Sequence, residues 1–316
     1  MRFDENAELD TSNINDMRGG GGGGGGGALG GRVAVGGGGL GIIGLILYFL
    51  LSQFGGGSLG GGGGLALPSG LSALGSGQTA DTTAIASSCR TGAQANTQLD
   101  CEVVAVVNSL DGYWSDTFAR SGQTYTPPRT NFFSGSTNTG CGGATSDTGP
   151  FYCPADKQVY IDLSFFKELE TRFGAQGGNF SRAYVIAHEY GHHIQDLLGT
   201  TDRVQTRDTG PTSGSVRLEL QADCYAGTWA NHAASVPTSS GKPLIQDITQ
   251  QDVASALDTA KRIGDDFIQT NLGNGRVDQG QFTHGSSAQR TKWYSTGYKT
   301  GNPAQCDTFA RGVNLG

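Results

Sequence analysis

The sequence lacks several patterns by which common protein functions are recognised. Its six cysteines include no Cys-x-x-Cys pair, which argues against a zinc–thiolate site and against a thioredoxin-like redox motif. No nucleophilic serine or cysteine lies in an elbow motif, and no glycine run continues into the Lys-Ser/Thr of a phosphate-binding loop. Basic residues are also few: 21 Lys and Arg against 28 Asp and Glu give a net charge of −7, which argues against nucleic acid as a partner.

Glycine is abundant but unevenly distributed. Runs of it account for much of the total of 54 and fill residues 19–27, 36–39, 55–57 and 60–64. Such runs lack the apolar side chains that offset the entropy of ordering, so we expect them to be spacers. The chain then divides into four parts: a Gly-rich head (1–32), an apolar segment (33–54), a Gly/Ser-rich linker (55–85) and a folded domain (86–316).

Residues 33–54 carry no charge, and the stretch is long enough to cross a bilayer as one transmembrane helix. Arg18 and Arg32 precede it, whereas the first basic residue after it is Arg90. The positive-inside rule therefore predicts a single-pass membrane protein with residues 1–32 in the cytoplasm and the domain periplasmic or extracellular. A cleaved signal peptide is the alternative, but the polar, acidic residues 1–18 and the lack of a nearby A-x-A site argue against it.

An even number of cysteines in an exported domain favours disulfide bonds. Our preferred pairing is Cys89–Cys101, Cys141–Cys153 and Cys224–Cys306, because the first two pairs are close in the chain and could close short loops. Six cysteines allow fifteen pairings, so other connectivities stay open. Six free thiols are the alternative if the domain lies in the cytoplasm.

The most informative stretch is 181–199, which contains the HExxH sequence from His188 to His192. Ser181 is suited to be the N-cap of a helix here, and Gly199 to end it. Four helical residues turn about 400° and rise about 6 Å, so His188 and His192 point the same way and can share one tetrahedral metal ion. Glu189 lies about 100° round the helix, where it can reach a metal-bound water without becoming a ligand. The pattern predicts a zinc site rather than a solvated polar helix.

A second helix is predicted at residues 216–233. Two histidines leave a zinc ion short of one protein ligand, and a carboxylate from this helix can complete the set. We choose Glu219 for that ligand. Asp223 lies one turn further on and can accept the remaining ring N–H of a ligand histidine. The apolar residues around both acids do not fit the alternative, a set of solvated helix charges.

The rest of the domain is expected to be mainly helical with a small sheet. Helices are predicted at 100–120, 164–173 and 249–269, the last with a start resembling a capping box at Thr249. Residues 122–149 are typical of a turn-rich loop. The alternating residues 157–163 predict a strand, which could bind a peptide substrate by strand addition or be an ordinary core strand.

Three further histidines lie outside the HExxH pair. His284 is followed by Arg290 in a segment with aromatic neighbours, so both could line the cleft, and His284 is a candidate catalytic group. His193 and His232 are expected to be structural or solvated.

The sequences HEYGHHIQ, ELQADCYAG and FTHGSSAQR, behind a Gly-rich head and one apolar segment, resemble the bacterial family of putative neutral zinc metallopeptidases over essentially the whole chain. The HExxH with a downstream ExxxD is also similar to membrane-associated gluzincins, including the CAAX-prenyl endopeptidases, in which that Glu is the third zinc ligand. The resemblance implies an α+β, zincin-like fold, one catalytic Zn²⁺ and hydrolysis of a peptide or protein substrate. It implies that His188, His192 and Glu219 bind the zinc ion, and that Glu189 matches the glutamate of the family's HExxH motif.

The expected mechanism follows from this site. Zinc lowers the pKa of its bound water from about 15.7 to about 7, and Glu189 takes the proton and passes it to the leaving amine. Zinc, with His284 as a possible donor, would stabilise the oxyanion. The alternative is a non-catalytic cell-envelope scaffold or binding module stabilised by zinc. That module would need a fourth protein ligand, His193 or His284, and it would have no use for Glu189.

Overall fold

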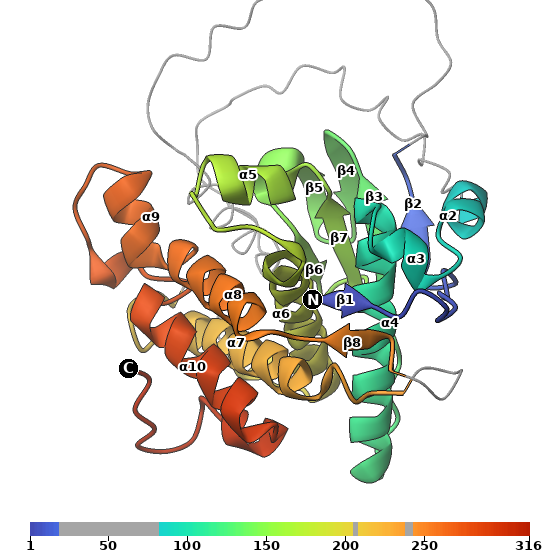
Figure 1. Ribbon diagram of the computed structural model, residues 1–316. Coiled ribbons are helices and arrows are strands. Elements are labelled where there is room, and N and C mark those ends of the chain that lie inside the picture. Colours follow the sequence, from blue (N-terminus) through green and yellow to red (C-terminus); the bar gives the residue numbers. More distant parts are fainter. Residues whose placement is uncertain (19–81, 205–207, 238–242) are drawn as a thin grey trace, which may run out of the picture.

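The computed structural model describes residues 1–18, 82–204, 208–237 and 243–316 (Figure 1). The predicted membrane segment at 33–54, the glycine runs and most of the predicted linker lie outside these ranges. Within the described ranges, no helix is both long enough and apolar enough to cross a membrane. The fold is a mixed α+β arrangement, in which helices lie beside and below a small sheet.

The main sheet has four strands in the order β2-β3-β7-β6. Its first three strands run parallel, and β6 pairs antiparallel with β7. Two further pairs of strands, β1-β8 and β4-β5, are antiparallel. The bounds are β1 Arg2–Phe3, β2 Ile14–Asp16, β3 Arg129–Phe133, β4 Ser136–Thr139, β5 Gly142–Thr145, β6 Phe151–Cys153, β7 Gln158–Asp162 and β8 Ile245–Asp247.

Helix α6 lies at the centre of the fold, where it packs on α4, α7 and α8 and against β6 and β7. Its central position explains why most of its residues are buried. The predicted apolar stripe of the first long helix is confirmed, since Val103, Val107, Leu110, Trp114 and Phe118 of α4 are all buried. The bounds are α2 Thr82–Ser88, α3 Gly92–Ala95, α4 Leu99–Arg120, α5 Phe165–Thr171, α6 Asn179–Leu197, α7 Gly214–His232, α8 Gln250–Arg262, α9 Asp265–Asn271 and α10 Ser287–Thr300.

All six cysteines form disulfide bonds, and the predicted pairing is confirmed: Cys89–Cys101, Cys141–Cys153 and Cys224–Cys306. The third bond joins α7 to the short 3₁₀ helix η5 (Pro303–Cys306) that follows α10. It therefore fixes the second helix of the predicted zinc site to the C-terminal part of the chain.

Two helix predictions need correction. The helix expected at 249–269 is two helices, because the backbone of Gly264 between them is extended, with φ −72° and ψ 144°. The close approach to α10 at this point requires a glycine, since a Cβ there would lie 2.4 Å from the backbone N of Ser287. The helix containing HExxH begins at Asn179, two residues before Ser181, whose side chain is buried against Thr259 instead of capping. Its predicted end at Gly199 is confirmed by a φ of 68° there.

The prediction of a loop at 122–149 is wrong in part, since β3, β4 and β5 lie within it. Strand β3 forms because β2 and β7, both distant in sequence, pair with its two edges. The predicted strand at 157–163 is β7, and both of its edges are paired too. It is therefore an ordinary core strand and not the strand to which a peptide can add.

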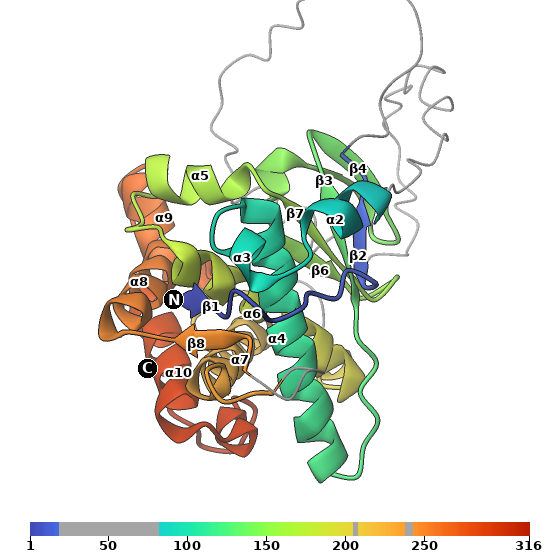
Figure 2. The same ribbon diagram turned by 45° about the vertical axis from the view of Figure 1, so that its right-hand side comes forward.

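Residues 1–18 lie in the same folded unit as the domain, although the sequence analysis assigns them to a separate head. β2 is a strand of the main sheet, and β1 pairs with β8. Phe3 and Ile14 are fully buried. Figure 2 shows the trace of these residues running across α4 on its way to β2. A domain boundary at residue 86 leaves this part of the fold out.

Candidate metal centre

Two helices bring together the three predicted ligands. The Nε2 atoms of His188 and His192, both on α6, are 3.2 Å apart. The carboxylate of Glu219, on α7, lies 3.1 Å from the first Nε2 and 3.4 Å from the second. Ligand atoms bonded tetrahedrally to zinc at about 2.0–2.1 Å are separated by roughly 3.3 Å. The three side chains therefore fit one zinc ion.

Among the described residues, one other group of three could in principle hold a metal: Cys89, Asp100 and Cys101. Its two cysteines are joined in a disulfide bond, and a disulfide has no thiolate to offer. The cluster at His188 is therefore the candidate metal centre.

A glycine allows the two helices of the centre to approach. A Cβ on Gly191, inside the HExxH sequence, would lie 2.8 Å from the Cα and 2.9 Å from the carbonyl oxygen of Ala222 on α7. These are backbone atoms, which cannot turn aside. The close contact places Glu219 within reach of the two histidines.

We therefore expect Gly191→Ala to weaken zinc binding by about 10–100-fold, as when groups that position a ligand are lost. Gly112→Ala on α4 is the matched control, because its new methyl would meet a side chain, Val236, at 3.2 Å. Zinc affinities are measured by competition with a chromophoric chelator. An affinity of Gly191→Ala equal to that of the parent would contradict this role of the glycine.

Both histidines present the same ring atom to the centre. The Nδ1 of His188 lies 2.9 Å from Oδ1 of Asp223, as the sequence predicts, and the Nδ1 of His192 lies 2.9 Å from Oε1 of Gln195. In a neutral imidazole, an Nδ1–H that donates to such an oxygen leaves the Nε2 lone pair for a metal. Gln195 was not predicted, although its position three residues after His192 on a helix was a usable signal.

Asp223 is fully buried and is held by a polar network behind His188. Arg290, itself buried, donates to both carboxylate oxygens at 2.8 and 2.9 Å, and the Tyr184 hydroxyl donates to one of them at 2.6 Å. Burial alone would raise the pKa of Asp223, but Arg290 and His188 hold it below its usual value. Arg290 thus lies behind the ligand instead of lining a cleft.

The charges at the centre favour a cation. Burial acts to raise the pKa of Glu219, but the charges of His192 and His284 hold it well below the usual range, so the carboxylate is ionised. Burial acts to lower the pKa of His188, but Asp223 and Glu219 raise it to about 10. A proton and a metal ion therefore compete for the same nitrogen.

This competition predicts how zinc affinity depends on pH. Because the pKa of His188 is about 10 without metal, the ring is protonated at neutral pH and loses a proton when zinc binds. The apparent affinity should therefore rise about tenfold for each unit from roughly pH 6 to pH 8. Chelator competition across this range measures it, and an affinity that does not change with pH would contradict the expectation.

Glu189 lies beside the centre but is not one of its three candidate ligands. It is 8% exposed, and burial raises the pKa of its carboxyl, while the charges of His188 and His192 act in the opposite direction. The backbone of Tyr152, on β6, also acts to lower the pKa of this carboxyl. A carboxylate with a raised pKa at such a place is suited to accept and return a proton near neutral pH.

His284 is held next to Glu219 by an acid that the sequence analysis missed. Its Nδ1 lies 3.1 Å from Oδ1 of Asp265, and the other oxygen accepts from the backbone N–H groups of residues 283, 284 and 285 at 2.8–2.9 Å. Burial lowers the pKa of His284, but Glu219 and Asp265 raise it above the usual value. No described residue bonds its Nε2. Asp265 was missed because it lies within the helix that the sequence predicted at 249–269.

The other two histidines lie away from the centre. In His193, Nε2 is 2.7 Å from the carbonyl oxygen of Thr126 and Nδ1 is 3.2 Å from the hydroxyl of Tyr152. His232 lies 2.9 Å from the carbonyl oxygen of Gly301 and stacks on Tyr113. Both make contacts that hold parts of the fold together.

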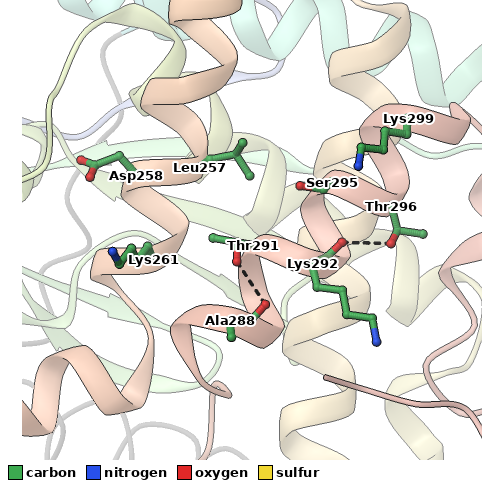
Figure 3. A pocket seen from close by; sticks show the side chains of 9 residues that line it. All are labelled: Leu257, Asp258, Lys261, Ala288, Thr291, Lys292, Ser295, Thr296 and Lys299. Atoms are coloured by element: carbon green, nitrogen blue, oxygen red, sulfur yellow. Dashed lines mark hydrogen bonds between the residues drawn. The ribbon is translucent and has the colours of Figure 1, made fainter.

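An open groove of about 620 Å³ lies between α8 and α10 (Figure 3). Lys261, Lys292 and Lys299 line it together with hydroxyl side chains and one acid, Asp258. None of the residues of the metal centre lines this groove, so it is a separate feature.

Comparison with known proteins shows the family of this chain. The profile of the family described as "Putative neutral zinc metallopeptidase" matches residues 1–309. An uncharacterized protein of Mycobacterium tuberculosis (strain ATCC 25618 / H37Rv) is 49% identical over 225 residues, which cover 71% of this chain and 75% of the relative. The uncharacterized protein YpfJ of Escherichia coli (strain K12) is 41% identical over 213 residues, 66% of this chain and 70% of the relative. No solved structure matches the chain. The chain therefore belongs to the putative neutral zinc metallopeptidase family.

Proposed function

We propose that this protein is a zinc-dependent endopeptidase whose ligands are His188, His192 and Glu219. The observation that carries the proposal is the three-ligand cluster with a buried fourth side chain, Glu189, beside it. Three protein ligands are typical of catalytic zinc, which needs an open position, whereas structural zinc has four. Among the described residues, the cluster has no fourth His, Cys, Asp or Glu.

Bound zinc would supply a Lewis acid that lowers the pKa of a water molecule and polarises the substrate carbonyl. Glu189 accepts the proton of the attacking water and returns it to the nitrogen of the leaving amine. Its buried position and raised pKa support both transfers. Asp223 and Gln195 hold the two histidine rings in place.

His284 is proposed to donate a hydrogen bond to the substrate oxygen as negative charge develops on it. Two observations support this role: Asp265 fixes the ring through Nδ1, and Glu219 and Asp265 favour its protonated form. Asp265 acts here through His284 and is a positioning residue.

The substrate is proposed to be a peptide in extended conformation that lies along β6. This strand is at the end of the four-stranded order, where it pairs with β7 through one of its two edges. The backbone of Tyr152 on this strand acts on the pKa of Glu189, and α6 packs on the strand, which places β6 next to the proposed proton acceptor. Backbone hydrogen bonds along a strand edge bind a peptide with little dependence on its sequence.

We further propose that the domain acts outside the cytoplasm. The three disulfide bonds support an oxidising compartment.

The test is hydrolysis of an unfolded polypeptide by the purified full chain. Activity should disappear when zinc is removed with a chelator and return when zinc is restored at stoichiometric amount. A chain that binds zinc at these residues but cleaves no peptide, folded or unfolded, would instead favour a zinc-stabilised scaffold.

A further inference from the structure

Residues 1–18 are bound to the rest of the fold by backbone hydrogen bonds at both ends and in the middle. β1 pairs with β8 at one end, and β2 pairs with β3 at the other. Between them, Gly92 donates to the Ala7 carbonyl and Leu9 donates to the Arg90 carbonyl, both at 2.9 Å. The segment is thus held along most of its described length.

Three asparagine side chains of the domain fix the position of the segment. Asn96 bonds both the N–H and the carbonyl of Phe3, each at 3.0 Å. Asn108 does the same for Asp10, at 2.8 and 2.7 Å, and Asn131 accepts from the Asn15 side chain at 2.9 Å. An amide that bonds both backbone groups of one residue fits a single register of the segment.

The domain is also shaped to receive the segment. Phe3, Ala7 and Ile14 are at most 4% exposed, so their side chains form part of the core. A Cβ on Gly92 would lie 2.0 Å from the carbonyl oxygen of Asp4, so a glycine is needed where the segment passes. Ile14 is the partner of Thr130 in the register of β2 and β3. The hydroxyl of Thr130 lies 3.2 Å from the hydroxyl of Tyr190, which is part of the HExxH sequence.

We infer that in the cell residues 1–18 are docked on their own domain and lie on the same side of any membrane as residues 82–316. A chain that crossed a bilayer once between these two parts would put them in different compartments, and their contacts could not form. The docked segment is therefore incompatible with a single crossing between the two parts, in contrast to the topology that the charge distribution predicts.

A cysteine pair across the docked strand tests the inference. Asn15 and Asn131 are partners in the register of β2 and β3. Paired strands are about 4.8 Å apart, within the range of about 4.4–6.8 Å between the Cα atoms of a disulfide. The full chain carrying Asn15→Cys and Asn131→Cys is treated in intact cells with a short, membrane-permeant thiol–thiol cross-linker. Remaining thiols are blocked before lysis, and links are mapped by mass spectrometry.

We expect most chains to carry a link between positions 15 and 131, formed as a disulfide bond or through the reagent. A second pair, Asp10→Cys with Asn108→Cys, repeats the test at another contact. The control pair, Asn15→Cys with Ser295→Cys on α10, should give no link. If neither test pair links in intact cells but both link after detergent lysis, the two parts lie on opposite sides and the inference is wrong. Links between two chains would reject docking on the chain's own domain.

Discussion

Replacing Glu189 by glutamine should reduce hydrolysis of an unfolded polypeptide at least about a hundredfold, the usual worth of a general base. Glutamine keeps the size and shape of the side chain but cannot take a proton from the attacking water. Because Glu189 is not one of the three candidate ligands, the variant should bind zinc and have a melting temperature near that of the parent. Initial rates, zinc content and melting temperature are measured on the same preparations.

His188→Ala is the informative companion of this variant. It removes a ligand, so zinc, activity and some stability should all be lost together. A scaffold would give the opposite contrast, with Glu189→Gln unchanged in every assay and only the ligand change harmful. Equal proteolysis by the parent and Glu189→Gln, with contaminating proteases excluded, would reject the proposed mechanism.

The second large effect is expected at Glu219. Glu219→Ala should abolish zinc binding at stoichiometric metal, because the two histidines alone offer an incomplete site. The carboxylate is buried, and its pKa is held well below the usual range, so it is ionised and ready to bind a cation at neutral pH. Metal content after dialysis against trace zinc measures the loss.

Asp223→Asn is the matched change one turn further along α7. It keeps the shape of the side chain and an oxygen for His188, so zinc should still bind, about 10–100-fold more weakly. If Glu219→Ala retained zinc and Asp223→Asn lost it, the two carboxylates would have the reverse roles.

The local patterns of the sequence were sufficient to predict the metal cluster. An HExxH sequence on one helix fixes two ligands by helical geometry alone, and Glu219 and Asp223 repeat that spacing on the next helix. The disulfide pairing also followed from positions along the chain, since two of the bonds close short loops. Residues close in sequence carry the information within each helix and each short loop, whereas the Cys224–Cys306 bond spans 82 residues.

The features that were missed depend on contacts between distant parts of the chain. The strand partners of β3 lie far away in the sequence. Asp265 bonds to residues 283–285 only because the helix is interrupted at Gly264. Residues 1–18 are polar and are followed by glycines, so their composition indicates a head separate from the domain. Their place in the fold depends on asparagines of the domain that no local pattern connects to them.

The most direct test of the central claim is a crystal structure of the zinc-loaded protein with anomalous data at the zinc edge. We expect a single strong peak bonded to Nε2 of His188, Nε2 of His192 and the carboxylate of Glu219, with water in the fourth position and Glu189 within hydrogen-bonding reach of that water. A peak elsewhere, or a fourth ligand supplied by His193, His284 or another side chain, would contradict the account of a catalytic zinc site.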